Sequence, residues 1–372
     1  MALLILCDPR YRNNEWCETK LRGIYDEAAR RRISVKLYTN LDLFITAASK
    51  LDSDSSVIVL FNSFTYLEKV SVALAPLSIH PILSVTESDI TFSRAFSQVC
   101  GDVDSATKEL VEFLRANGKR RIALIGSSEN SAAGRNKEKM LLRHVSESNC
   151  TIFRNKGNLL ESFNEFLELR KNFDTVICID DYQAVSFIEF LQSKNAYDPS
   201  LYIISHGDTA ISELYGDGIS TVSTSFYACG RAMVEAHIHR LKYNWSTVMI
   251  RVHCDFKARG STSGNAEYPL ASAESSCPNL LLIGRLESLL KGSDLVNLKL
   301  MYGLLCEYSY ERMSDMCFLS SGAVKYRLLQ MRRALGCKNR EETALCIGRY
   351  IQKEKLLEAI EKAEGIGGKV FN

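Results

Sequence analysis

The sequence predicts an α/β protein with two lobes of doubly wound parallel sheet, followed by a small all-α domain. Short apolar runs alternate with amphipathic runs over the first 260 residues, and these units are too many for one sheet. Residues 260–278 are rich in Gly, Ser, Ala and Pro, which is typical of a linker. Short helical patterns follow this linker and predict the separate helical domain.

The alternating runs predict strands and helices in turn. Strands are expected at residues 3–7, 33–38, 57–61, 82–85, 96–100, 122–126, 175–179, 202–205 and 221–223. Helices are expected at residues 15–31, 41–50, 106–117, 131–145, 182–193 and 227–243. In doubly wound sheets, ligands bind beyond the carboxyl ends of the strands. The expected binding loops are therefore those after Cys7, Phe61, Val85, Gly126, Ile179 and Ser205.

The bulk properties are those of a globular protein with several domains. The chain has 372 residues, of which 46% are hydrophobic, and this length allows two or three domains with their own cores. Its 12 cysteines include no CxxC pair and no Cys/His cluster with metal-ligand spacing, so we expect free thiols in a reducing cytoplasm and neither metal nor cofactor. No run near 18 apolar residues exists, and MALLILCDPR is too short for a signal peptide, so no membrane partner is expected.

A one-sided helix is predicted near the C-terminus. A serine of the junction Leu319-Ser320-Ser321-Gly322 is its expected N-cap, and Gly336 is its expected end. Four apolar residues share one side and should face a core: Val324, Leu328, Met331 and Leu335. From residue 320 to 340 the chain has no acid but six bases: Lys325, Arg327, Arg332, Arg333, Lys338 and Arg340. A basic face of this kind suits DNA phosphates, although many helices have a solvated basic face without binding DNA.

The side opposite the apolar stripe is the expected base-reading face. It carries Tyr326, Leu329, Gln330 and Arg333, with Lys325 on its flank. Arg327 and Arg332 lie on the flanks of the helix and are expected to contact phosphates. A tail after Tyr350 alternates Lys and Glu, and it fits a docking or dimer helix as well as a frayed end.

Residues 294–352 resemble the helix-turn-helix domain of LuxR-type transcription regulators. Ten residues are in register with the family pattern without a gap: Ser309, Met313, Leu319, Ser320, Val324, Lys325, Met331, Leu335, Gly336 and Arg340. Ala323 and Arg327 replace the usual Thr and His, and Arg312 and Ser314 replace a Glu and an Ala. The resemblance implies a domain at 293–352 that binds double-stranded DNA, but its base preference does not transfer.

Residues 1–263 resemble the effector domain of the lactose-repressor and galactose-repressor family. The matching segments are GSSENSAAGR at 126–135, FDTVICIDDYQA at 173–184, the run that begins YIISHGDTA at 202, and FKARGSTS at 256–263. The resemblance implies a two-lobed, type I periplasmic-binding-protein-like fold. Lobe one would hold 1–100 and 226–245, lobe two 102–224 and 247–263. Residues 264–292 would be a linker with a connecting helix, and 353–372 a C-terminal helix and tail.

The resemblance and the strand ends together indicate effector-binding residues. Arg135 follows a serine-rich loop that includes Ser128 and Ser131, and it is the nearest cation to that loop. Asp180 stands where the family has a ligand-binding Asn, whereas Asp181 is expected to be a helix N-cap. The family's first Asp of the GDT turn is Gly207 here, which leaves Asp208 as the candidate. Other candidates to line the first lobe are Asp8, Trp16, Asn62 and Phe92, of which Trp16 and Phe92 could instead be packing residues.

These features predict a non-enzymatic, ligand-responsive transcription regulator that acts as a homodimer. A response regulator needs an acid pair after its first strand, but Asp8 stands alone there. A solute-binding protein is disfavoured by the missing signal peptide and the basic C-terminal stretch. No GxGxxG, P-loop or GxSxG motif supports an enzyme. The sequence does not identify the effector, which is expected to be a small polar molecule such as a sugar.

Overall fold

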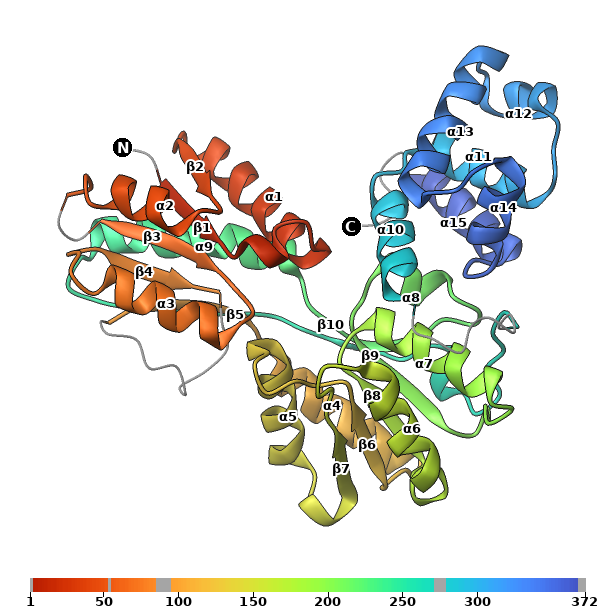
Figure 1. The fold of residues 1–372 in the computed structure, drawn as a ribbon, viewed down its shortest axis with the longest axis horizontal. Helices are drawn as coiled ribbons and strands as arrows, with labels where there is room; N and C mark the ends of the chain where they lie inside the picture. The colour runs from red at the N-terminus through yellow and green to blue at the C-terminus, as the bar shows by residue number, and fades with distance from the viewer. Residues whose placement is uncertain (1–2, 53–54, 85–94, 271–278, 367–372) are drawn as a thin grey trace. The chain divides into compact units, whose positions relative to one another are not determined.

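The computed structural model describes residues 3–52, 55–84, 95–270 and 279–366. The chain divides into two compact units (Figure 1). The first unit comprises residues 1–117, 127–154 and 223–256, and the second comprises 118–126, 155–222 and 257–372. The chain contains two parallel-dominated sheets with surrounding helices and a further all-helical region, so the predicted fold class is confirmed.

The first sheet has six strands in the order β11-β5-β4-β3-β1-β2. Their bounds are β1 Leu3–Cys7, β2 Val35–Tyr38, β3 Ser56–Leu60, β4 His80–Leu83, β5 Ser97–Gly101 and β11 Met249–Val252. All five ladders between them are parallel. β11 therefore belongs to the first sheet, whereas residues 247–263 were expected in the second lobe. A four-residue edge strand carries no local signal for the sheet that it joins.

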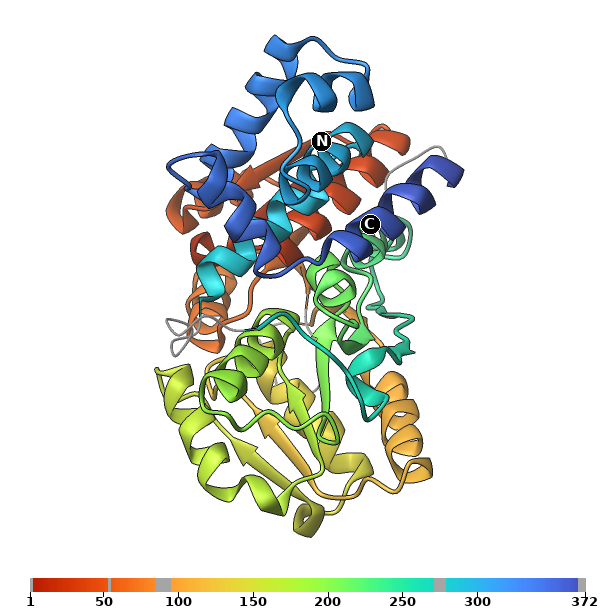
Figure 2. The ribbon, with the colours of Figure 1, turned by 90° about the vertical axis from the view of Figure 1, so that its right-hand side faces the viewer.

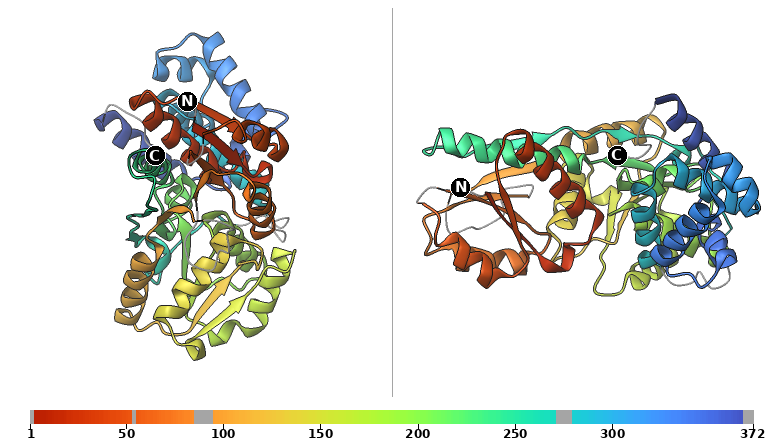
Figure 3. Two further views of the ribbon diagram at one scale, coloured as in Figure 1. Left: turned by 90° about the vertical axis from the view of Figure 1, so that its left-hand side faces the viewer. Right: turned by 90° about the horizontal axis from the view of Figure 1, so that it is seen from above.

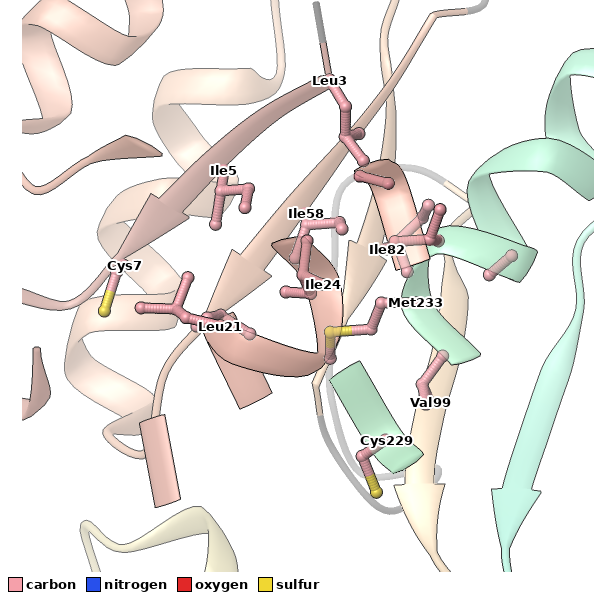
Figure 4. Packing of buried hydrophobic residues seen from close by; sticks show 14 of the residues in the cluster. Leu3, Ile5, Cys7, Leu21, Ile24, Ile58, Ile82, Val99, Cys229 and Met233 are labelled. Atoms are coloured by element: carbon pink, nitrogen blue, oxygen red, sulfur yellow. The ribbon is translucent and has the colours of Figure 1, made fainter. Parts of the chain in front are cut away.

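Helices cover both faces of this sheet (Figure 3). α1 (Glu15–Arg30) and α9 (Phe226–Lys242) pack on one face, and α2 (Leu41–Ala48) and α3 (Phe64–Leu74) supply the core of the other. Figure 4 shows the first of these cores, in which Ile5, Ile58 and Met233 are fully buried. Because the inner strands β1, β3 and β4 are covered on both faces, they are buried along their whole length, whereas the edge strands β2 and β11 are partly exposed.

Two glycines let α1 and α9 approach each other closely. A Cβ on Gly23 would lie 2.1 Å from the carbonyl oxygen of Tyr227, and one on Gly230 would lie 2.0 Å from that of Lys20. Any side chain at either position would push the helices apart. The contact therefore sets the separation of α1 and α9 and holds the backbone of Lys20 in place.

The second sheet has the order β12-β10-β9-β8-β6-β7. Its strands are β6 Ile122–Ile125, β7 Cys150–Phe153, β8 Thr175–Cys178, β9 Tyr202–Gly207, β10 Ser220–Ser223 and β12 Phe256–Lys257. Within the second unit, α6 (Leu159–Leu169), α7 (Asp181–Ser193) and α8 (Ala210–Leu214) accompany them. α7 is buried on nearly all sides, because α8, α10 and β9 contact it as well as β8.

Several elements were absent from the sequence expectation. They include α3, α6, α8, β7 and β11, together with the 3-10 turns at Pro9–Tyr11, Glu147–Asn149, Arg170–Asn172 and Gly260–Thr262. β7 has only four residues, and its first three are not fully buried, so it lacks the apolar run of the other strands. The first unit also contains α4 (Val103–Ala116) and α5 (Ala132–His144), both close to the predicted ranges.

Six helices form the rest of the second unit (Figure 2). They are α10 Leu280–Lys291, α11 Leu295–Leu305, α12 Tyr310–Cys317, α13 Ser321–Leu335, α14 Arg340–Gly348 and α15 Lys353–Ile366. α15 buries Leu356, Ile360 and Ala363 and packs on α11. The predicted tail is therefore a docked helix of this domain. No helix in the described ranges is long and apolar enough to cross a membrane.

Candidate functional site

α13 has the termini and the buried stripe that the sequence predicts. The Ser320 hydroxyl accepts a hydrogen bond from the amide of Ala323 at 3.2 Å, and Gly336 ends the helix in the left-handed region with φ 77°. Val324, Leu328, Met331 and Leu335 are all buried. α12 precedes α13 after a turn of three residues, and both helices pack together. The two form a helix-turn-helix.

The opposite side of α13 is open to solvent. Lys325, Tyr326, Gln330 and Arg333 are exposed, and Leu329 is half-buried. In the described part of the chain, the side chains of Arg333 and Lys338 have no acidic partner, although the backbone amide of Lys338 donates to the carboxylate of Glu342. Arg332 is half-buried beside this face. The side chains expected to read bases thus share one accessible face of a helix whose other face is fixed in a core.

Two predicted phosphate contacts have partners inside the domain. Arg327 donates to both carboxylate oxygens of Asp294, at 2.8 and 3.0 Å, and to Asn297, so it ties α13 to the start of α11. Arg340 donates to the carbonyl of Tyr308 and lies 4.9 Å from the centre of the Tyr310 ring. Both side chains hold the helices together, which the charge pattern alone did not reveal. We no longer expect them to be the main phosphate contacts.

In the first unit, the side chains of Asp8 and Asn62 accept hydrogen bonds from neighbouring protein groups. The Asp8 side chain is fully buried and accepts from Arg10 Nε at 3.0 Å and Nη2 at 2.7 Å. Asn62 Oδ1 accepts from the amide of Ala133 at 3.0 Å. These bonds orient the two strand ends. They make Asp8 and Asn62 supporting residues rather than free ligand groups.

The serine-rich loop is fixed at the start of α5. Ser131 caps α5 by accepting from the amide of Gly134 at 3.0 Å, and the Ser128 carbonyl accepts from the amide of Ser131. Arg135 is exposed, and its guanidinium lies 5.4 Å from the centre of the Phe64 ring. No described acid of the first unit pairs with it. Phe92 lies outside the described residues.

In the second unit, Asp180 and not Asp181 caps α7. Asp180 caps α7 by accepting from the amide of Gln183 at 2.8 Å. Asp181 is buried and accepts from the hydroxyls of Ser205, Thr209 and Thr221. It also accepts from the Thr209 amide at 2.8 Å. The prediction that Asp181 is the N-cap is therefore wrong, because hydroxyls from β9, from the start of α8 and from β10 converge on its carboxylate.

Asp208 lies at the turn after β9, with φ 60°. Its carboxylate pairs with Lys257 at 2.5 Å and with Arg259 at 2.6 Å. Burial raises the pKa of Asp208, but these two cations outweigh burial and the net pKa is lowered. Asp208 thus anchors residues 257–259 to the turn, which leaves little of its charge for a ligand.

Glu287 of α10 links the helical domain to the second sheet's helices. Its carboxylate is fully buried and accepts from the amides of Ala210 at 3.1 Å and Ile211 at 2.8 Å, at the start of α8. Burial raises its pKa to about 7. A second contact joins Arg349 of α14 to Glu189 of α7 at 2.6 Å. α10 was expected to be a connecting helix, and these contacts dock it.

One candidate effector group was missed by the sequence analysis. Lys20 of α1 places its ammonium 4.9 Å from the centre of the Trp16 ring and 2.6 Å from the Ser84 hydroxyl. Its neighbours come from distant parts of the chain, so a lysine in an amphipathic helix gives no local signal. Spacing alone shows only that Trp16 and Lys20 share a face of the helix.

A hollow of about 380 Å³ lies in the second unit at the amino-terminal ends of β6, β8 and β9. Lys119, Arg121 and Arg170 line it, but Arg121 pairs with Asp174 and Arg170 with Asp198. This edge is opposite the one where doubly wound sheets bind ligands. Among the described residues, no cluster of three or more His, Cys, Asp or Glu side chains fits a metal ion.

No protein-family profile matches the chain, and no curated protein sequence matches it either. Solved structures do match. The transcriptional regulator CelR in complex with cellobiose has a TM-score of 0.59 at 14% identity, over 70% of this chain and 84% of that chain. A putative transcriptional regulator LacI from Bacillus cereus subsp. cytotoxis NVH 391-98 has a TM-score of 0.57 at 17% identity, over 71% and 100%.

The Lac repressor bound to ONPG in the repressed state is similar too, with a TM-score of 0.56 at 13% identity, over 70% of this chain and 82% of that chain. At such identities the likeness shows the fold alone. The chain has the two-lobed, periplasmic-binding-protein-like fold of LacI-family regulators. The LuxR-type resemblance of the helix-turn-helix remains a prediction.

Proposed function

We propose that this protein is a ligand-responsive transcription regulator whose C-terminal helix-turn-helix, of the LuxR type, binds double-stranded DNA. Helix α13 carries the proposal. It is capped at both ends and anchored by a buried stripe, and it exposes Lys325, Gln330 and Arg333 on its outer face. A rigid helix that presents basic side chains and a side-chain amide on an open face has the properties needed to enter the major groove of DNA.

The effector region is proposed to sense a small polar molecule of the sugar class. The fold likeness to LacI-family regulators supports this, since one neighbour is a complex with cellobiose and another is bound to ONPG. Arg135, Ser128 and Trp16, all in the first unit, are the proposed effector contacts, with Asn62 holding the start of α5 beside them. Binding would shift a population of conformations and not perform chemistry, as expected for a regulator that is not an enzyme.

A homodimer in the cytoplasm is the proposed working form. One recognition helix contacts too few bases for useful specificity, so two copies on two half-sites are expected. The cytoplasm is proposed because a regulator of this kind would act where the DNA is. Light scattering with and without duplex DNA measures the oligomeric state, and a monomer at micromolar concentration under both conditions would count against the dimer.

The DNA-binding proposal is tested by fluorescence anisotropy of a labelled duplex with the full chain. The salt concentration is varied between about 50 and 200 mM, where binding through phosphate contacts weakens strongly. Replacing Arg332, Arg333 and Lys338 by Ala should weaken binding and flatten the salt slope by up to about one unit per contact. The matched control replaces the exposed Lys50, Lys69 and Lys108 of the first unit by Ala, which changes net charge equally. An affinity that does not depend on salt, or equal losses in both variants, would overturn the proposal.

A further inference from the structure

The ammonium group of Lys20 lies at the carboxyl edge of the first sheet. It donates to the hydroxyl of Ser84, the residue that directly follows β4, at 2.6 Å. It lies 4.9 Å from the centre of the Trp16 ring and 5.5 Å from that of Phe226, the first residue of α9. Three segments far apart in sequence thus surround one cation, at the edge where this fold class binds ligands.

This cation has no counter-charge among the described residues of the first unit. Its nearest titratable neighbours are three thiols, Cys17, Cys100 and Cys229. Burial lowers the pKa of Lys20, in keeping with a charge that lacks an acidic partner. An ammonium has three N–H donors, and Ser84 accepts from one of them. The other two remain for an acceptor, for example on a ligand.

The acids of α1 are all directed elsewhere. Glu27 pairs with Arg30, Arg31 and Arg231. Glu18 lies 3.5 Å from Arg12, Glu15 accepts from Thr19, and Asp26 accepts from Tyr227. The close packing of α9 on the Lys20 carbonyl, through Gly230, also limits any shift of the backbone toward one of these acids.

A second unpartnered donor belongs to the same sheet edge. The Tyr66 hydroxyl of α3 is buried and has no hydrogen-bond partner in the described residues. Burial raises the pKa of Tyr66 above its usual range, with the Asp8 carboxylate as a further cause, so the hydroxyl keeps its proton. The Asp8 carboxylate at this edge pairs with Arg10 and does not serve as the counter-charge of Lys20.

We propose that Lys20 binds an anionic group of the effector, so that the effector is a hydroxylated small molecule with a carboxylate or a phosphate rather than a neutral sugar. The inference rests on the proposed effector-sensing function and narrows its ligand class. The ammonium would bind the anion as a point charge, and the Trp16 ring would cover the apolar face of the same ligand. A ligand anion supplies the counter-charge that the described protein groups do not.

The test uses the full chain with Trp245→Phe, which leaves Trp16 as the fluorescent reporter, because the sequence has two tryptophans. The probes are glucose 6-phosphate, galacturonate, glucose, galactose and cellobiose. Fluorescence titration and thermal shift are measured for the parent and for Lys20→Met, Lys20→Gln and Lys20→Arg. Glucose 6-phosphate is the charged counterpart of glucose, and galacturonate that of galactose, so each pair isolates the anion. Cellobiose adds a neutral disaccharide.

An anionic probe should bind more tightly than its neutral counterpart, and Lys20→Met should weaken it by about 10- to 100-fold, the loss of a charge-assisted bond. Lys20→Arg should recover part of this affinity. Free Lys20→Met should melt no lower than the parent, since it removes an unpaired, partly buried charge; Lys20→Gln serves if Met disturbs folding. A response to glucose 6-phosphate alone assigns phosphate, and one to galacturonate alone assigns carboxylate.

Two outcomes would overturn the inference. If glucose, galactose or cellobiose binds as tightly as the anionic probes and Lys20→Met changes nothing, the effector is neutral, and effector sensing itself stands. If no anionic probe binds to any variant, the inference fails. Failure of all five probes would also count against a sugar-class effector, while the separate DNA measurement still decides the regulator proposal.

Discussion

Replacing Arg349 by Met should loosen the docking of the helical domain on the second sheet's helices. Arg349 Nε lies 2.6 Å from Oε1 of Glu189, and the Glu189 side chain is only 3% exposed. Burial raises the pKa of Glu189 although Arg349 lowers it, so the carboxylate depends on its partner. The substitution keeps the apolar length of the side chain and leaves an acid buried without a counter-charge.

The expected cost is about 3 kcal/mol. Removing one member of a buried pair costs roughly 3–5 kcal/mol, and the lower end applies because Arg349 is 22% exposed. Coulomb attraction at about 4 Å between charge centres gives a similar figure, about 4 kcal/mol at an effective dielectric constant of about 20. A loss of about 3 kcal/mol corresponds to a change of about a hundredfold in the docking equilibrium.

Native-state hydrogen exchange measures this equilibrium in the folded protein. The amides of Ala210 and Ile211 donate to Glu287 of α10, so they are protected only while α10 stays docked. α10 also packs on α13, so both anchors should release together. Arg349→Met should lower their protection about a hundredfold.

Two further variants complete the experiment. Glu189→Gln with Arg349→Met should regain much of the protection, because the buried charge is gone. The exposed Arg333→Met is the matched control and should change nothing. Protection within a factor of about three of the parent in Arg349→Met, with no coupling in the double variant, would refute the docking argument.

Three other predictions follow from single residues. Gln330→Ala or Arg333→Ala should cost about 1–3 kcal/mol at particular bases, measured by binding to a randomised duplex library, and a uniform loss at all sequences would mean that the face is misassigned. Arg135→Ala should leave the melting temperature of the free protein nearly unchanged while removing the ligand-induced shift; a loss of several degrees with the shift retained would make Arg135 structural. Burial raises the pKa of Glu287 from 4.5 to about 7. Its protonated form therefore stabilises docking below pH 4.5, and this stabilisation, about 3 kcal/mol in all, is lost as the pH rises through 7. Protection of Ala210 and Ile211, corrected for intrinsic exchange, should therefore fall between pH 5 and 8 and become flat in Glu287→Gln.

The sequence predicted those parts of the protein whose signals are local. Alternating apolar and amphipathic runs predicted the two parallel sheets, because strands covered on both faces are apolar throughout. The helix α13 was predicted almost to the residue, since its N-cap, its Gly end and its four-residue stripe all lie within one short segment. Short elements such as β7 and α8 were missed because few residues carry their pattern.

The roles of charged side chains were decided by the tertiary structure. Asp180 and Asp181 are adjacent in sequence, yet one caps a helix and the other receives three hydroxyls from segments 24 to 40 residues away. The charge pattern predicted that Arg327 contacts phosphate, but in the structure this side chain pairs with Asp294. Charge and spacing describe what a side chain can do, but the partner it meets depends on non-local folding.

Composition and periodicity by themselves thus determined the fold class, the helical C-terminal region and the side of α13 that faces solvent, because burial imposes a repeat on the sequence itself. Only the tertiary structure decided that Lys20 has no described counter-charge, that β11 joins the first sheet, and that Glu287 and Arg349 dock the helical domain. These are contacts between residues distant in the chain, and no repeat or motif records them.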